Sequence, residues 1–199
     1  GTPVVEDDVY GELHHSSTRP LPLKAFDTEG LVLYCSSFSK CLAPGYRVGW
    51  TLAGRYSHAA HKLKMMSSLA TAVPSQLAVA EYLEEGGYDR HLRQLRKTLA
   101  DSLGRLRQMV LSHFPKGTRV SRPAGGYFLW VQLPDGVDTL ALHREALAHG
   151  ISIAPGALFS ADQRFRSALR LNGGHPQDPR IEEAVRWLGR RLVRTHSHQ

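Results

Sequence analysis

The sequence has few cysteines and no long apolar run. Only Cys35 and Cys41 occur among its 199 residues, which excludes a disulfide-stapled scaffold, and their spacing is not that of a metal site. No stretch approaches the roughly 20 apolar residues that span a bilayer. The chain also starts without a basic leader followed by an apolar run. We therefore expect a cytoplasmic protein with no membrane partner.

Dense basic tracts and metal-ligand patterns are also missing. The 25 Lys and Arg residues exceed the 18 Asp and Glu residues, but the excess is spread along the chain. The densest cluster, Arg90, Arg93, Arg96 and Lys97, has helical spacing, which favours a solvated helix face over a phosphate-binding stripe. None of the eleven histidines pairs with a nearby carboxylate at ligand spacing, so we predict no metal site.

What is present is an ordinary globular composition, with 42% apolar and 22% charged residues. The apolar run at residues 31–35 is typical of a strand covered on both faces, as in the mostly parallel sheet of an α/β domain. In the first half of the chain we predict strands over residues 3–7, 30–36 and 46–52, then helices over 58–69, 75–85 and 89–113. Pro74 and Ser75 mark the predicted start of the second helix.

The pattern then changes to that of a smaller α+β unit. We predict strands near 118–122, 127–133, 151–154 and 167–171, and helices over 139–149 and 179–194. The predicted domains are thus part of a large domain (residues 1–88), a connecting helix (89–114) and a small C-terminal domain (115–199). Three strands are too few for an open sheet buried on both faces, so we expect the chain to begin inside the large domain.

Two polar segments follow predicted strands of the first half. Asp7 and Tyr10 come after the first strand, at the carboxyl end where open α/β sheets bind ligands. The alternative is that Asp7 and Asp8 only cap a turn. The second strand ends in Ser37, Ser39 and Lys40.

Arg47 comes seven residues after this lysine. A lysine flanked by hydroxyls and a guanidinium has the surroundings of an amine nucleophile beside a bound phosphate. Gly45 is the residue expected to let the backbone turn back toward the sheet.

With Asp-x-x-Tyr after one strand and Ser-x-x-Lys after the next, the chain resembles fold-type I, class I/II aminotransferases, which use pyridoxal phosphate (PLP). The resemblance implies that Lys40 binds PLP covalently and that Asp7 pairs with its pyridine nitrogen. It implies further that Tyr10 donates a hydrogen bond to the 3-oxygen of the PLP ring. Ser37 and Arg47 would hold the phosphate, with Ser39 as a weaker candidate. A carboxylate at the ring nitrogen keeps it protonated, which makes PLP an electron sink. Lys40, once displaced by an incoming amine, would move the proton.

The second half extends the resemblance. Residues 123–130 are similar to the family's Gly-Gly strand, and residues 153–159 to its Pro-Gly-x-x-Phe turn. Arg170 matches the arginine that binds the substrate carboxylate, for which a bidentate guanidinium is the natural partner. The alternative for Arg170 is an exposed arginine on an edge strand.

Within the family, residues 6–13, 36–50 and 86–96 look most like MocR-type members of the GntR regulators. There an N-terminal helix-turn-helix domain binds DNA, and the aminotransferase-like domain senses an effector. The resemblance implies such a sensor, a homodimer that recognises an amino compound with a carboxylate, and DNA binding only through a domain outside this chain. A free-standing aminotransferase and a PLP-independent interaction module are the alternatives.

Overall fold

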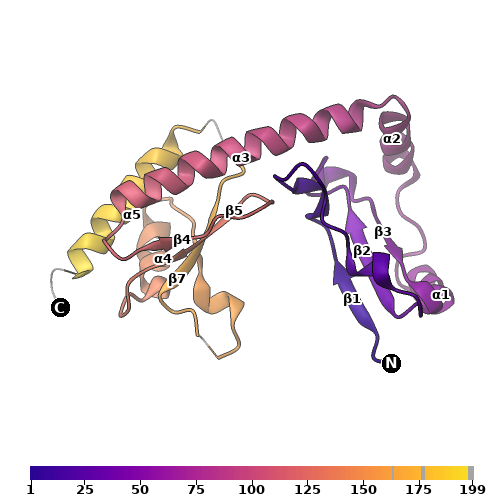
Figure 1. The fold of residues 1–199 in the computed structure, drawn as a ribbon, viewed down its shortest axis with the longest axis horizontal. Coiled ribbons are helices and arrows are strands. Elements are labelled where there is room, and N and C mark those ends of the chain that lie inside the picture. The colour runs from indigo at the N-terminus through magenta and orange to yellow at the C-terminus, as the bar shows by residue number, and fades with distance from the viewer. Residues whose placement is uncertain (163, 176–177, 197–199) are drawn as a thin grey trace. The chain divides into compact units, whose positions relative to one another are not determined.

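The computed structural model describes residues 1–162, 164–175 and 178–196. The chain divides into two compact units, Gly1–Lys97 and Thr98–Gln199, and the division falls inside one long helix (Figure 1). The split of the first half into a large-domain part and a connecting helix stays a prediction. No helix of the described residues is both long and apolar enough to cross a bilayer.

The first unit has a three-stranded sheet in the order β1-β2-β3. Its strands are β1 (Val4–Asp7), β2 (Val32–Ser37) and β3 (Gly49–Leu52). Strands β1 and β2 are parallel, with Asp7 opposite Cys35, whereas β3 runs antiparallel to β2. The connection from β2 to β3 spans residues 38–48 and includes the 3₁₀ turn η3 (Pro44–Tyr46). It is shorter than the crossover of a dozen or more residues that a parallel strand needs. The α/β class is confirmed, with a mixed sheet.

The helices of this unit bury little. They are α1 (Ser57–Ser68), α2 (Val73–Glu84) and the first turns of α3 (Gly87–His113), and short 3₁₀ turns η1 (Gly11–Leu13), η2 (Leu23–Phe26) and η4 (Gly54–Tyr56) connect the strands. Helix α1 has no buried residue, and α2 buries only Val79. The start predicted for α2 is wrong: the helix begins at Val73 with Pro74 in its first turn, where the missing N–H of proline breaks no helical hydrogen bond.

The strands of the first unit are also less covered than the apolar run at 31–35 predicted. Tyr34 is the one buried residue of β2, Val5 of β1 is 70% exposed and Leu52 of β3 is 54% exposed. The apolar composition of these strands is typical of a sheet covered on both faces, but in the described residues the sheet does not have that cover.

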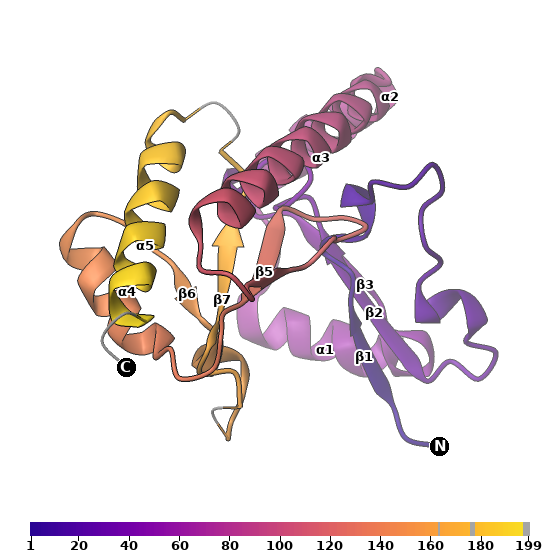
Figure 2. The ribbon, with the colours of Figure 1, turned by 60° about the vertical axis from the view of Figure 1, so that its left-hand side comes forward.

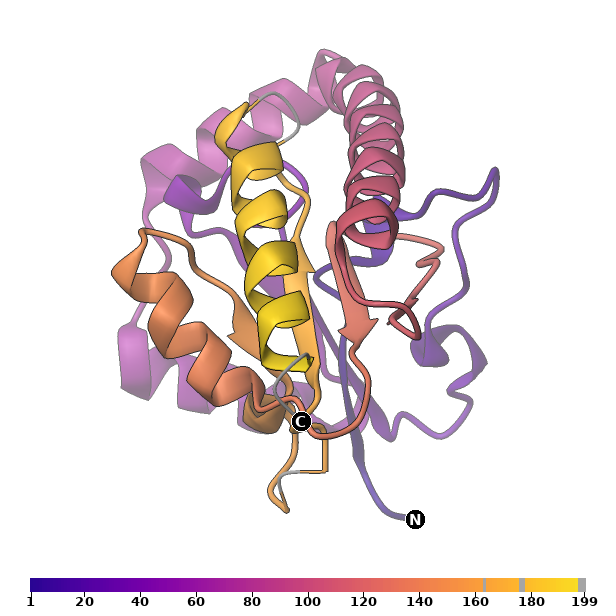
Figure 3. The same ribbon diagram turned by 90° about the vertical axis from the view of Figure 1, so that its left-hand side faces the viewer.

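The second unit has a four-stranded antiparallel sheet in the order β4-β5-β7-β6. Its elements are β4 (Arg119–Val120), β5 (Phe128–Gln132), α4 (Thr139–Ala148), β6 (Ala154–Pro155), η5 (Gly156–Phe159), β7 (Ala168–Asn172) and α5 (Arg180–His196). Helices α4 and α5 and the end of α3 lie on one face of the sheet (Figures 2 and 3). Successive side chains of a strand point to opposite faces of the sheet. In β5 and β7 the side chains that point toward these helices are Leu129, Val131, Leu169 and Leu171.

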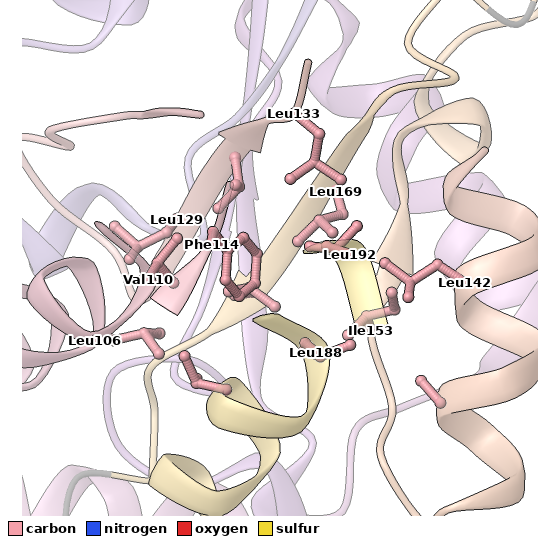
Figure 4. Close-up of a cluster of buried hydrophobic side chains, with 14 of the residues drawn as sticks. Leu106, Val110, Phe114, Leu129, Leu133, Leu142, Ile153, Leu169, Leu188 and Leu192 are labelled. Carbon is pink, nitrogen blue, oxygen red and sulfur yellow. The ribbon is translucent and has the colours of Figure 1, made fainter. Parts of the chain in front are cut away.

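A continuous apolar core fills the space between this sheet and its helices. Leu129 and Leu169 of the sheet meet Leu106 of α3 and Leu188 and Leu192 of α5 (Figure 4). Helix α3 carries buried apolar residues at spacings of three, four and seven, which form one stripe along it; they are Leu92, Leu99, Leu103, Leu106 and Val110. The Asp138 side chain caps α4 by accepting from the Leu140 and Ala141 amides.

Candidate active site

Lys40 lies in a tight turn directly after β2. The amides of Leu42 and Ala43 both donate to the Phe38 carbonyl, at 2.9 and 3.1 Å, so residues 38–43 form one helical turn. The lysine is exposed, and among the described residues its amine has no hydrogen-bond or ion-pair partner. Its Nζ is therefore available to a ligand.

The residue after Lys40 anchors this turn to α3. The Cys41 Sγ lies 3.1 Å from the Tyr88 hydroxyl, and the Cys41 carbonyl lies 2.9 Å from His91 Nε2. Burial raises the pKa of the Cys41 thiol and also that of the Tyr88 phenol, so both groups stay neutral at neutral pH. The Phe38 ring packs edge-on against Tyr88. The turn that carries Lys40 is thus fixed from its buried side.

The three candidate phosphate ligands lie together. The Ser39 amide donates to Ser37 Oγ at 3.3 Å, and Arg47 Nη1 donates to Ser39 Oγ at 3.3 Å. Arg47 also donates to the Pro44 carbonyl at 3.2 Å, which holds its guanidinium over the turn. Hydroxyls and a guanidinium at these distances make a donor set suited to phosphate oxygens.

Arg47 itself, not Gly45, makes the sharp turn of this segment. Its φ is +56°, in the left-handed region that costs a non-glycine residue about 1–2 kcal/mol. Gly45 lies inside the 3₁₀ turn η3, and its φ is not positive. The expectation for Gly45 is therefore wrong. The strained backbone of Arg47 is consistent with a ligand-binding position, where such strain is often found.

Asp7 differs from the other acids of its segment. It accepts one long hydrogen bond, 3.3 Å from the Val9 amide. Glu6 instead accepts from the Leu23 and Lys24 amides, and Asp8 and Glu12 form ion pairs with arginines. Of the four carboxylates in residues 6–12, that of Asp7 is the one left for a ligand.

A polar network, which we call the arginine network, explains how this segment is held. Arg19 pairs with Asp8 and with Glu12, and Arg96 donates to the Glu12 carboxylate at 2.9 Å and to its carbonyl at 2.7 Å. The Tyr34 hydroxyl donates to Asp8 at 2.8 Å. The network thus fixes both sides of Tyr10, whose carbonyl accepts from the amide of Leu13, the last residue of η1.

Sequence reasoning missed the arginine network. Arg96 belonged to a cluster predicted as a solvated helix face, and Arg93 and Lys97 are indeed exposed, but Arg96 is partly buried against Glu12. Arg19 lies in a proline-rich loop that carried no ligand signal. The one available sign was the surplus of acids at residues 6–12, since carboxylates at the end of a strand need cations or amides to balance them.

The sheet topology brings the candidate residues of the first unit to one edge. Because β1 and β2 are parallel, their carboxyl ends share an edge, and the antiparallel β3 begins at that same edge, with Gly49 opposite Ser37. Asp7 and Tyr10 follow β1, Ser37 to Lys40 follow β2, and Arg47 precedes β3. The Lys40 amine, the Asp7 carboxylate, which has no ion pair among the described residues, and the phosphate donor set therefore occupy one edge. Together these groups fit a cofactor that has an aldehyde, a basic ring nitrogen and a phosphate.

Arg170 lies in β7 of the second unit. It points away from the helices, because Leu169 and Leu171 on either side of it face the core. Its guanidinium carbon is 4.1 Å from the centre of the Phe128 ring and 4.8 Å from that of Phe159. In the part of the chain that the structure describes, no group of three or more His, Cys, Asp and Glu side chains is placed to bind a metal.

Comparison with known proteins gives one consistent family. The family model for aminotransferase class I and II matches residues 1–188. An "uncharacterized HTH-type transcriptional regulator" of Escherichia coli K12, YdcR, is 44% identical over 187 residues, 94% of this chain and 40% of the regulator. Aromatic-amino-acid aminotransferase 1 of Thermococcus litoralis is 35% identical over 188 residues, 93% of this chain and 45% of that enzyme.

A solved structure shows the same fold. The α-aminoadipate aminotransferase LysN of Thermus thermophilus, complexed with N-(5'-phosphopyridoxyl)-L-leucine, aligns with a TM-score of 0.89 at 33% identity. The alignment covers 99% of this chain and 51% of LysN. The chain thus spans about half, or less, of the length of the proteins that it matches.

Proposed function

Because this chain belongs to the aminotransferase class I and II family, we propose that it is the C-terminal part of the PLP-binding sensor domain of a GntR/MocR-type transcriptional regulator. PLP is the cofactor of this family, as the phosphopyridoxyl complex of LysN illustrates. The observation that carries the proposal is the sheet edge where the unpartnered Lys40 amine, the Asp7 carboxylate and the Ser37, Ser39 and Arg47 cluster come together.

Each residue has a role that follows from its chemistry. PLP supplies an aldehyde that reacts with amines and a ring that accepts electron density. Lys40 would hold the cofactor through its amine and, once displaced, move a proton. Asp7 would place its negative charge beside the ring nitrogen, and Tyr10 would donate to the ring oxygen. Arg47 and the two serines would bind the phosphate.

The regulatory role rests on the relatives. Two HTH-type regulators of Escherichia coli K12 are 44% and 37% identical to this chain, against 35% for the Thermococcus litoralis aminotransferase. As a sensor, the domain would bind an amino compound with a carboxylate, and the difference in affinity between two conformations would shift DNA binding. DNA itself would be bound by a helix-turn-helix domain outside this chain. We also propose a homodimer, which the resemblance to aminotransferases implies, and a cytoplasmic location.

A free-standing aminotransferase acting on an amino acid is the second candidate. The identities of 35% and 33% to aminotransferases of Thermococcus litoralis and Thermus thermophilus favour it. The candidate residues are compatible with both functions, since a sensor and an enzyme use the same amine and the same carboxylate.

The experiment that separates the two uses the natural-length protein with PLP. Binding to the DNA upstream of its own gene is measured by fluorescence anisotropy, with and without each of the twenty L-amino acids, and 2-oxo acid formation is measured in parallel. We expect at least one amino acid to change the DNA dissociation constant about fivefold or more, and a Lys40→Ala variant to bind DNA but not respond. Lys62→Ala, at an exposed position of α1, is the matched control.

Protein that binds no DNA but transfers amino groups would contradict the regulatory role and support the second candidate. A Lys40→Ala variant that holds PLP as tightly as the unchanged protein would contradict both.

A further inference from the structure

Arg170 is held by aromatic rings rather than by acids. Its guanidinium lies over Phe128 and Phe159, and among the described residues it has no carboxylate or hydrogen-bond partner. Arg191 of the same unit shows the usual alternative, because its guanidinium pairs with Glu145 through two nitrogens. The guanidinium carbon lies over both rings, and no oxygen among the described residues accepts from the Arg170 N–H groups.

Phe128 reaches Arg170 through the register of the sheet. Gly126 has a φ of +74°, so the chain turns immediately before β5, and the alternation that buries Leu129 and Val131 turns Phe128 and Trp130 to the opposite face. Trp130 is directly opposite Arg170. The strand that follows Gly125 and Gly126 thus places the Phe128 ring next to Arg170.

Phe159 reaches the same place through the turn η5. A Cβ on Gly156 would lie 2.2 Å from the Phe165 carbonyl and 2.7 Å from that of Ala168, so only glycine lets this turn pack against the chain that enters β7. Pro155, paired with Leu169 in the sheet, fixes the chain immediately before this turn. The Phe159 ring then packs edge-on against Trp130, with centres 5.5 Å apart.

We propose that Phe128 and Phe159 are positioning residues that hold the Arg170 guanidinium ready for a planar carboxylate. The proposal rests on the proposed function, in which Arg170 binds the carboxylate of an amino compound, and adds that the two rings set the strength of the preference for amino acids over amines without a carboxylate.

The physical reasons are orientation and desolvation. A free arginine loses side-chain entropy when it binds, whereas one already stacked between fixed groups loses less. Ring faces also displace water from the guanidinium, and an ion pair is stronger where water is excluded. The N–H groups have no oxygen acceptor among the described residues, so they can bind both carboxylate oxygens together.

The test measures amine selectivity in the natural-length protein loaded with PLP. Each of the twenty L-amino acids is titrated, followed by the absorbance of the cofactor, and the tightest binder is compared with the amine made by its decarboxylation. We expect Phe159→Leu and Phe128→Leu each to weaken amino-acid binding about tenfold, which corresponds to about 1.4 kcal/mol. Binding of the amine should change less than twofold.

Two variants separate positioning from packing. Phe159→Tyr keeps the ring face and should retain the selectivity. Phe165→Leu removes a ring that packs on Trp130 but is not one of the two rings under the Arg170 guanidinium, so it should leave the selectivity unchanged.

Equal weakening of amino acid and amine in the Phe128 and Phe159 variants would overturn the inference, as would unchanged selectivity. So would PLP-loaded protein that responds to no L-amino acid. Failure to bind PLP at all would instead count against the proposed function.

Discussion

The two units of the chain are stabilised in different ways. The second unit has one continuous apolar core of sixteen buried residues, drawn from both its sheet and its helices. The first unit buries few apolar side chains and relies on polar contacts. Lys24 and two amides bind Asp27, and two arginines bind Glu12. The candidate cofactor residues lie in the polar unit, and the candidate carboxylate receptor lies on the well-packed one.

This difference suits the two tasks. A cofactor site must present an amine, a carboxylate and phosphate donors without neutralising them, and a polar network can bind the neighbouring acids while Asp7 stays available. A carboxylate receptor needs one arginine in a fixed orientation, and a strand on a dense core provides that.

The largest expected contrast comes from shortening a leucine in each unit. Leu188 of α5 is 1% exposed in the core and Leu52 of β3 is 54% exposed. We expect Leu188→Ala to lower the free energy of unfolding by about 3 kcal/mol because it leaves a cavity, and Leu52→Ala by less than about 1 kcal/mol. Urea unfolding of the purified protein measures both.

Leu158→Ala, at an exposed position of the second unit, is the control and should behave like Leu52→Ala. Equal losses for Leu188 and Leu52 would show that the first unit also depends on apolar burial, and the comparison between the units would fail.

A smaller effect is expected from the arginine network. Arg96→Ala leaves the Glu12 carboxylate with one fewer cation and its carbonyl without that donor, which should cost about 2 kcal/mol of stability. PLP affinity should also fall, because Asp7 and Tyr10 belong to the segment that the network holds. Arg93→Ala, one turn earlier on the same helix and exposed, is the matched control. If the two variants lose the same stability, the network does not hold this segment.

The smallest effect is the loss of stability at low pH that depends on the Asp27 carboxylate. A hydrogen bond from Lys24 and two from the Val32 and Leu31 amides lower the pKa of Asp27 far below its ordinary value. The stabilisation is therefore complete above the ordinary pKa of about 3.9 and is lost as the pH falls through the lower pKa of the folded state. Asp27→Asn should destabilise the protein at pH 7 and much less at pH 2.

Urea midpoints at the two pH values measure this change, with the exposed Glu29→Gln as control. A difference between the unchanged protein and Asp27→Asn that is the same at both pH values would contradict the role of the Asp27 charge.

The sequence predicted the parts of the fold that depend on local periodicity. The helix predicted over 89–113 and the strands predicted at 127–133 and 167–171 match α3, β5 and β7 within two residues. The reversed direction of β3 escaped prediction because an apolar run does not reveal which way a strand runs. The start of α2 was misplaced because Pro74 can lie before a helix or inside its first turn.

The candidate site shows the same limit. Lys40, Asp7 and the phosphate cluster were predicted from spacing after strands, which is local information. The partners of Asp8 and Glu12 were not, because Arg19 and Arg96 are distant in sequence and belong to a loop and a helix without a signal of their own. The strain at Arg47 also depends on the fold of the turn rather than on its composition.

The most direct test of the account is to identify the lysine that binds PLP. The natural-length protein is incubated with PLP, reduced with sodium borohydride to fix the cofactor on its lysine, digested, and mapped by mass spectrometry. We expect the phosphopyridoxyl group on Lys40 and no specific label in a Lys40→Ala variant. A label on another lysine, such as Lys24 or Lys62, or no label at all, would contradict the site.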